Sequence, residues 1–211
     1  MAYSDFSLTK VRDSFGLTFD ESEDLFSSVA PVVPSDVLTL ILADYVPLAT
    51  AIATEKARSE FLIAPLLAEV RRQLKNRVSL FSGNEFPVAP KLGLYGFCDY
   101  IVSHSPEQLM ITAPVMTIVE AKRENIVGGL GQCVAAMVAA QLFNQQAGRE
   151  VKTVYGAVTT GTNWKFLTLT EKTVSVDLIE YFVNQPGKIL GILMEPFRGS
   201  TPEQRALSPS V

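Results

Sequence analysis

The sequence predicts an α/β protein in which helices cover the faces of a mixed β-sheet. Three observations indicate this class. Two runs of helical character come first, one after Ser35 and one after Thr54. Segments rich in β-branched and aromatic residues follow, bounded by Gly, Pro and Asn, which is typical of strands. A long run of small apolar residues, 128–146, separates these segments into two groups and has the character of a buried helix.

The helices and strands are expected in a definite order along the chain. Ser35 and Thr54 can each cap a helix, and Pro65 is expected to kink the second helix or to change its direction before it ends near Lys75. Pro186 suits the first turn of a short final helix. The expected strands lie within 78–83, 93–104, 114–122, 151–160, 164–170 and 173–179.

A chain of 211 residues is long enough for one domain with a substantial core. We expect an N-terminal extension (1–34), a main domain (35–198) and a polar C-terminal tail (199–211). The N-terminus lacks the basic and apolar regions of a secretory signal, and no apolar stretch approaches the roughly 18 uninterrupted residues of a membrane span. These features predict a cytoplasmic protein with no membrane partner, whose two cysteines are reduced.

Composition and missing motifs exclude several kinds of site. The net charge of −4 argues against a protein that coats nucleic acid, because neutralising phosphates requires a basic surface. A single histidine, His104, excludes zinc sites built on several histidines, and no C-x-x-C pair replaces them. No G-x-S-x-G nucleophile motif is present, and the G-G-L-G at 128–131 lacks the other residues of a nucleotide-binding loop.

Charged residues interrupt two otherwise apolar strand faces. Alternate residues of a strand share a face, which groups Phe97, Asp99 and Ile101 in one strand, and Met116, Ile118, Glu120 and Lys122 in another. By the same rule Cys98 points with Tyr100 to the opposite face. If the two strands are neighbours, Asp99 lies beside Glu120 and Lys122.

This combination of residues suits metal-assisted hydrolysis of a phosphodiester. Paired carboxylates at a strand end favour a hard divalent cation, Mg²⁺ or Mn²⁺, which takes oxygen ligands and keeps several waters. A lysine two residues further on can orient or deprotonate the attacking water, or stabilise the charge that develops on the phosphate.

An ordered set of motifs resembles the PD-(D/E)XK, or restriction-endonuclease-like, nucleases. The set comprises Glu55 or Glu60 on an early helix, Asp99 in a strand, Glu120-Ala121-Lys122 in the next strand, and Gln132 on the helix after it. The segment T-E-K-A-R-S-E-F-L-I-A-P-L-L also resembles the entry helix of type I restriction-enzyme nuclease domains. The resemblance covers about residues 54–170.

The resemblance implies a function as well as a fold. It implies a central sheet flanked by helices, metal-dependent cleavage of DNA by an endonuclease or related DNA-processing nuclease, and DNA as the partner. Asp99 and Glu120 would be metal ligands, joined by Glu55 or Glu60, while Lys122 and Gln132 would complete the catalytic group. The chain departs from the family in its acidic charge and in lacking a recognisable DNA-recognition, helicase or methylase segment.

Several alternatives remain open at this stage. The same charges are compatible with a noncatalytic nuclease-fold protein that binds a protein or nucleic acid, or with another kind of hydrolase. Glu55 and Glu60 are five residues apart on a helix, so at most one is expected to reach the metal. A homodimer is compatible with the apolar content. Aromatic and basic residues at 155 and 164–166 suit either stacking on nucleic acid or the packing of a hairpin.

Overall fold

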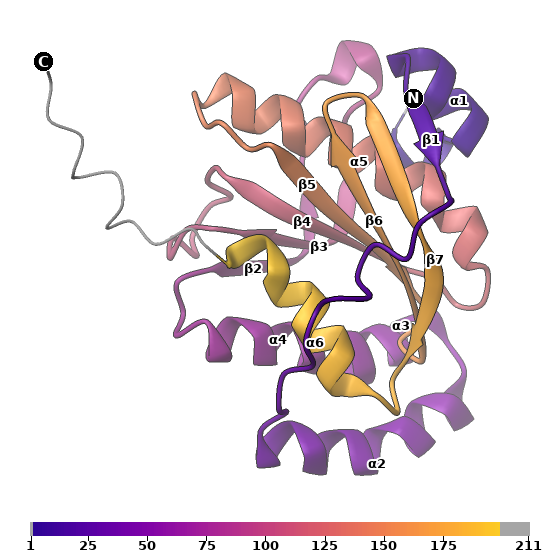
Figure 1. Ribbon diagram of the computed structural model, residues 1–211, viewed down its shortest axis with the longest axis vertical. Coiled ribbons are helices and arrows are strands. Elements are labelled where there is room, and N and C mark those ends of the chain that lie inside the picture. Colours follow the sequence, from indigo (N-terminus) through magenta and orange to yellow (C-terminus); the bar gives the residue numbers. More distant parts are fainter. Residues whose placement is uncertain (1, 199–211) are drawn as a thin grey trace, which may run out of the picture.

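A seven-stranded mixed sheet forms the centre of the computed structural model, which describes residues 2–198 (Figure 1). The strands lie in the order β1-β7-β6-β5-β4-β3-β2. Their bounds are β1 (Thr18–Asp20), β2 (Ser79–Glu85), β3 (Phe97–Ser103), β4 (Val115–Ala121), β5 (Thr153–Thr159), β6 (Asn163–Thr170) and β7 (Thr173–Phe182). The predicted α/β class with a mixed sheet flanked by helices is therefore confirmed.

Helices cover both faces of this sheet. They are α1 (Leu8–Phe15), α2 (Asp36–Ile52), α3 (Glu55–Arg58), α4 (Ala64–Gln73), α5 (Ile126–Gln146) and α6 (Pro186–Met194), with single 3₁₀ turns η1 (Tyr3–Asp5), η3 (Pro90–Leu92) and η4 (Glu195–Phe197). Helices α1 and α5 pack on one face, and α2, α4 and α6 lie on the other (Figure 1). Each face therefore buries its own hydrophobic cluster.

The predicted helix starts are confirmed by their caps. The Ser35 hydroxyl accepts from the Leu38 N–H at 3.2 Å, and the Thr54 hydroxyl accepts from the Ala57 N–H at 3.1 Å. The interruption expected at Pro65 comes just before it, as a π-helical turn, η2 (Ser59–Ile63), that joins α3 to α4. Pro65 itself lies in the first turn of α4, directly after this π-helical turn.

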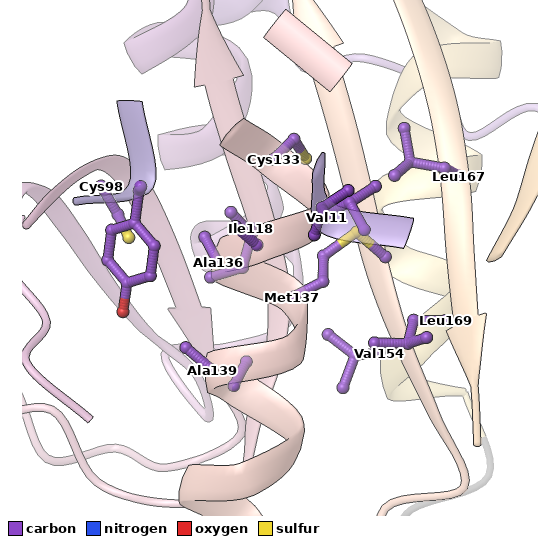
Figure 2. Close-up of a cluster of buried hydrophobic side chains, with 14 of the residues drawn as sticks. Val11, Cys98, Ile118, Cys133, Ala136, Met137, Ala139, Val154, Leu167 and Leu169 are labelled. Carbon is purple, nitrogen blue, oxygen red and sulfur yellow. The ribbon is translucent and has the colours of Figure 1, made fainter. Parts of the chain in front are cut away.

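Helix α5 connects two parallel strands, β4 and β5, and so crosses one face of the sheet. Its length and apolar composition match those of a membrane span, but more than half of its apolar window is buried against the sheet. Figure 2 shows its inner side, where Cys133 and Met137 pack among Ile118, Val154 and Leu167. The buried helix predicted for 128–146 is confirmed as the core helix of this layer.

The N-terminal residues belong to the same core and the same sheet. Strand β1, which the sequence did not predict, pairs in parallel with β7 at the edge of the sheet. The η1 turn and α1 pack on α5. The segment before α2 lies along α6, where the Lys188 ammonium donates to the carbonyls of Phe26 and Val29, each at 2.6 Å. The expected tail, 199–211, lies outside the described residues.

Gly131 allows the N-terminal segment to approach α5 closely. A methyl group at this position would come within 2.3 Å of the Phe6 carbonyl oxygen and 2.6 Å of the Ser7 carbonyl carbon. Both are backbone atoms, so neither can rotate away.

We expect Gly131→Ala to lower the free energy of unfolding by about 1–3 kcal/mol, as overpacking of a tight contact does. Urea denaturation measures this loss. Gln145→Ala, on the exposed end of the same helix, is the control for helix propensity and should change stability by less than about 0.5 kcal/mol. Equal stability of Gly131→Ala and wild type would show that the segment does not dock here.

Candidate active site

Asp99 and Glu120 lie side by side at one end of the sheet. Strands β3 and β4 are antiparallel, and Tyr100 pairs with Val119, so the start of β3 meets the end of β4. The Asp99 carboxylate accepts a hydrogen bond from the Ala121 N–H at 2.7 Å. Its side chain thus bridges the two strands where their ladder ends, next to Glu120.

Strand irregularities set the direction of the side chains around this point. The β2–β3 ladder has no Gly83–Asp99 pair, and Gly83 has a φ of 66°. Across this break Cys98 packs on the α5 side of the sheet, whereas Tyr100 packs on the other. The prediction that Cys98 shares a face with Tyr100 is therefore wrong, because simple alternation does not hold through Asp99.

A second irregularity corrects the predicted face of Met116. The register between β3 and β4 shifts where Val102 pairs with Thr117 and Ser103 pairs with Val115, which leaves Met116 unpaired. Met116 consequently packs on the α2, α4 and α6 side, away from Ile118. Such a bulge adds one residue to one strand and reverses the alternation beyond it.

Lys122 is held in place by both carboxylate and amide oxygens. Its ammonium lies 2.6 Å from Glu120 Oε1 and 3.3 Å from Gln132 Oε1. The Lys122 N–H donates to the Thr159 carbonyl at 2.8 Å and so extends the pairing of β4 with β5. The structure thus brings Lys122 and Gln132 together with Glu120, as the motif order suggests.

Gly129 gives the Lys122 side chain its path across α5. A methyl group on Gly129 would lie 2.9 Å from both Cγ and Cε of Lys122 and 2.7 Å from Val158 Cγ1. The sequence suggested a glycine hinge before the buried helix, but Gly129 lies within α5, which begins at Ile126. Gly129 lies three residues before Gln132 and so shares its side of the helix, and this spacing could have indicated from the sequence that it faces the site.

Burial and charge repulsion act on Glu120, whose residue is only 2% exposed. The pKa of Glu120 is raised from 4.5 to about 8, chiefly by burial and in part by Asp99, through its charge and a hydrogen bond between the carboxyl groups. Lys122 opposes the rise.

The same excess of negative charge also shifts the pKa of Lys122. Burial alone would lower the pKa of Lys122, but Glu120, Asp99 and Glu55 outweigh it and raise the pKa. One ammonium therefore faces three carboxyl groups. Such a site has negative charge left over at neutral and alkaline pH, which a divalent cation would balance.

The two helix glutamates differ in their positions. Glu55 Oε2 accepts from the Arg123 N–H at 3.0 Å, directly after Lys122 in the chain. Glu60 instead forms an exposed ion pair with Lys56, at 3.0 Å, and lines a groove between α2 and α4. The structure thus brings Glu55 to the site and leaves Glu60 outside it.

Both cysteines lie near the site without taking part in it. Burial raises the pKa of the Cys98 and Cys133 thiols, and the charge of Glu120 raises both further. Both are buried, unpaired thiols packed on the α5 side of the sheet (Figure 2). They remain neutral core residues, as expected from their size.

Other residues considered from the sequence are structural. His104 follows β3 at the end of the sheet opposite Asp99 and contacts Phe197, with ring centroids 5.6 Å apart. Trp164 and Phe166 are buried, with ring centroids 5.9 Å apart, so they pack the hairpin and do not face solvent.

The oxygen donors of the site fit a hard divalent cation. Asp99 and Glu120 supply adjacent carboxylates, and Glu55 lies close enough to influence Lys122. Within residues 2–198, no three side chains of His, Cys, Asp or Glu surround a common point closely enough to hold a metal alone. Mg²⁺ is often held by one or two carboxylates, with waters and substrate phosphate completing its octahedron. Asp99 and Glu120 supply two carboxylates of this kind.

Comparisons with known proteins leave the site to be interpreted from its geometry. No protein-family model matches the chain, and no curated protein is significantly similar to it.

Glu120 should make the metal-free protein lose stability as pH rises from about 5 to about 8. In this range the unfolded chain has released the Glu120 proton while the folded protein retains it, so raising the pH favours unfolding. The slope should approach about 1.4 kcal/mol per pH unit. Glu120→Gln should lack this loss, so its stability relative to wild type should increase as the pH rises from about 5 to about 8.

Urea denaturation in EDTA at several pH values tests this expectation. The difference between wild type and Glu120→Gln isolates Glu120 from His104, whose pKa is lowered by burial and which therefore acts in the opposite direction. Parallel stability profiles for the two proteins would contradict a raised pKa at Glu120.

The positions of the helix glutamates predict different effects on metal binding. Glu55→Gln should weaken Mg²⁺ binding about tenfold, because it removes negative charge beside the carboxylate pair. Glu60→Gln is the matched control and should leave the dissociation constant within about twofold, because Glu60 lies outside the site. Calorimetric titration measures both, and equal effects of the two variants would contradict this assignment.

Proposed function

We propose that this protein is a metal-dependent nuclease with a restriction-endonuclease-like fold, which hydrolyses phosphodiester bonds of nucleic acid, with DNA as its substrate. The observation that carries the proposal is the meeting of Asp99, Glu120 and Lys122 at one end of the sheet, with Gln132 on the lysine. These residues come from two neighbouring strands and the helix that follows them, in the order of the PD-(D/E)XK motifs.

Each residue has a role that its surroundings favour. Asp99 and Glu120 would hold Mg²⁺ or Mn²⁺, with Glu55 beside them. When bound, the cation would polarise the phosphate and lower the pKa of the attacking water. Gln132 and Glu120 fix the position of the Lys122 ammonium. Because the pKa of Lys122 is raised, this group is charged at neutral pH and suits stabilisation of phosphate charge better than removal of a proton.

A noncatalytic role has one observation in its favour. The Lys122 ammonium already has two partners within the chain, and Asp99 has a backbone partner, so the network is internally bonded without a substrate. In such a protein the charges would serve only to stabilise the end of the sheet. Removing the lysine would then strand buried carboxylates and lower stability, with no activity to lose.

Lys122→Met separates the two roles, because methionine keeps an unbranched stem over Gly129 and removes the charge. In a nuclease, this variant should cut about 10²–10³-fold more slowly, as after loss of a preorganised donor. It should still bind Mg²⁺, since lysine is not a ligand. Asp99→Ala should abolish both cation binding and cleavage. Lys152→Met, at an exposed position before β5, is the control.

The assay uses wild-type protein with Mg²⁺ or Mn²⁺ on single-stranded, duplex and branched DNA, together with calorimetry and thermal melting. Cleavage that persists at wild-type rates in Lys122→Met would refute the role of the lysine. Absence of cation binding and of cleavage, with a markedly lower melting temperature for Lys122→Met, would favour the noncatalytic role.

A further inference from the structure

A polar pocket of about 430 Å³ lies directly beside the candidate active site. One wall is Arg123 and the residues that follow it into the first turn of α5, and another is the β5–β6 turn, with Thr160 and Thr162. Both walls continue from the site: Arg123 follows Lys122, and the Lys122 N–H bonds to the carbonyl of Thr159. One wall therefore begins at the residue after the proposed catalytic lysine. The other begins at the residue after its backbone hydrogen-bond partner.

Arg58 supplies this pocket with a positive charge that has no carboxylate partner. One of its terminal nitrogens, Nη1, donates to the Thr160 carbonyl at 3.2 Å and to the Thr162 hydroxyl at 3.1 Å. Its Nε is buried without any partner. Among the described residues, no Asp or Glu lies within ion-pair distance of Arg58. A partly buried guanidinium of this kind favours an anion as its ligand.

Two glutamates, Glu124 and Glu180, also line the pocket, and each has a polar partner within it. Glu124 forms an exposed ion pair with Arg123, at 3.2 Å, and such pairs are weak and easily exchanged. Glu180 lies opposite Lys165 in the β6–β7 ladder and 3.5 Å from the amide nitrogen of Asn163. Arg58 is nevertheless the arginine of this pocket without a carboxylate within ion-pair distance, and Arg123 can exchange its exposed partner Glu124 for the same ligand.

We propose that this pocket binds the phosphate next to the scissile phosphodiester, and so fixes the register of the substrate strand at the cut. The proposal rests on the nuclease function above. Neighbouring phosphates of a strand are joined through one sugar, and the pocket lies next to Lys122 and Glu55 through Arg123. The hydroxyls of Thr160 and Thr162 and the guanidinium of Arg58 offer the mixture of neutral and charged donors that phosphate oxygens accept.

A titration with inorganic phosphate in metal-free buffer tests the pocket without metal or cleavage. Amide resonances of 123–127 and 160–163 should shift in wild type, and these shifts should be lost in Arg58→Gln. Arg12→Gln, an exposed arginine of α1, is the matched control and should respond as wild type does. Because Arg58 also joins α3 to the β5–β6 turn, Arg123→Gln serves as a second variant that leaves that contact intact and should weaken binding severalfold. Shifts that do not depend on Arg58 and Arg123, or that occur elsewhere, would overturn the proposal.

Oligonucleotides with a single uncharged methylphosphonate linkage test whether the bound phosphate belongs to the substrate strand. At one linkage adjacent to the cut, the neutral group should raise the KM of wild type about tenfold and that of Arg58→Gln by less than about twofold. If the neutral linkage instead raises the KM of wild type and of Arg58→Gln by the same factor, the proposal is overturned, even if inorganic phosphate binds in the pocket. If no oligonucleotide is cut, the same comparison is made on affinity, and equal penalties in both proteins again count against it. Failure of the nuclease function is recognised separately, by the absence of Mg²⁺ binding.

Discussion

The buried carboxylate of Glu120 is the constraint on which this end of the molecule depends. A carboxyl group that is 2% exposed and adjacent to another carboxylate is costly to ionise, and Lys122 is the cation that reduces the cost. Holding the lysine there requires three things of the fold: an extension of β4 beyond its last strand residue, Gly129 on α5, and Gln132 as a second partner. The position of the Lys122 charge beside Glu120 therefore depends on how α5 packs on the sheet.

The same helix is positioned from its other side by the N-terminal residues. Gly131 lets the backbone at Phe6 and Ser7 approach α5, two residues from the glycine that accommodates Lys122. A displacement of α5 away from the sheet would therefore loosen the contact of Gln132 with the lysine as well as the hydrophobic layer around Ile118 and Cys133 (Figure 2). Residues 2–34, which the sequence suggests are an extension, contribute both a strand of the sheet and this support.

Local sequence patterns predicted the elements that carry the site, whereas tertiary contacts decided the details. Helix caps at Ser35 and Thr54, the buried helix and the strands around Asp99 and Glu120 follow from periodicity and propensity. Strand β1 is three residues long and pairs with β7, more than 150 residues away in the chain, so no local pattern identifies it. Alternation failed at Met116 because the register between β3 and β4 shifts there, and at Cys98 next to the missing Gly83–Asp99 pair of the β2–β3 ladder. The choice between Glu55 and Glu60 required the π-helical turn and the Arg123 backbone, which spacing alone does not predict.

Charge distribution would reconcile an acidic chain with the polyanionic substrate that we propose for it. The net charge of −4 is spread over the whole protein, and the carboxyl groups of the site add to it locally. Direct approach of a phosphate to Asp99 and Glu120 would be repulsive without a counter-charge. In the proposed function a divalent cation would supply that charge at the carboxylates, and Arg58 would supply it in the adjacent pocket. Binding of the strand would then be coupled to binding of the cation, because each lowers the electrostatic cost of the other. A nuclease of the proposed kind would need no broadly basic surface, and its affinity for nucleic acid would depend on the cation more strongly than that of a basic DNA-binding domain.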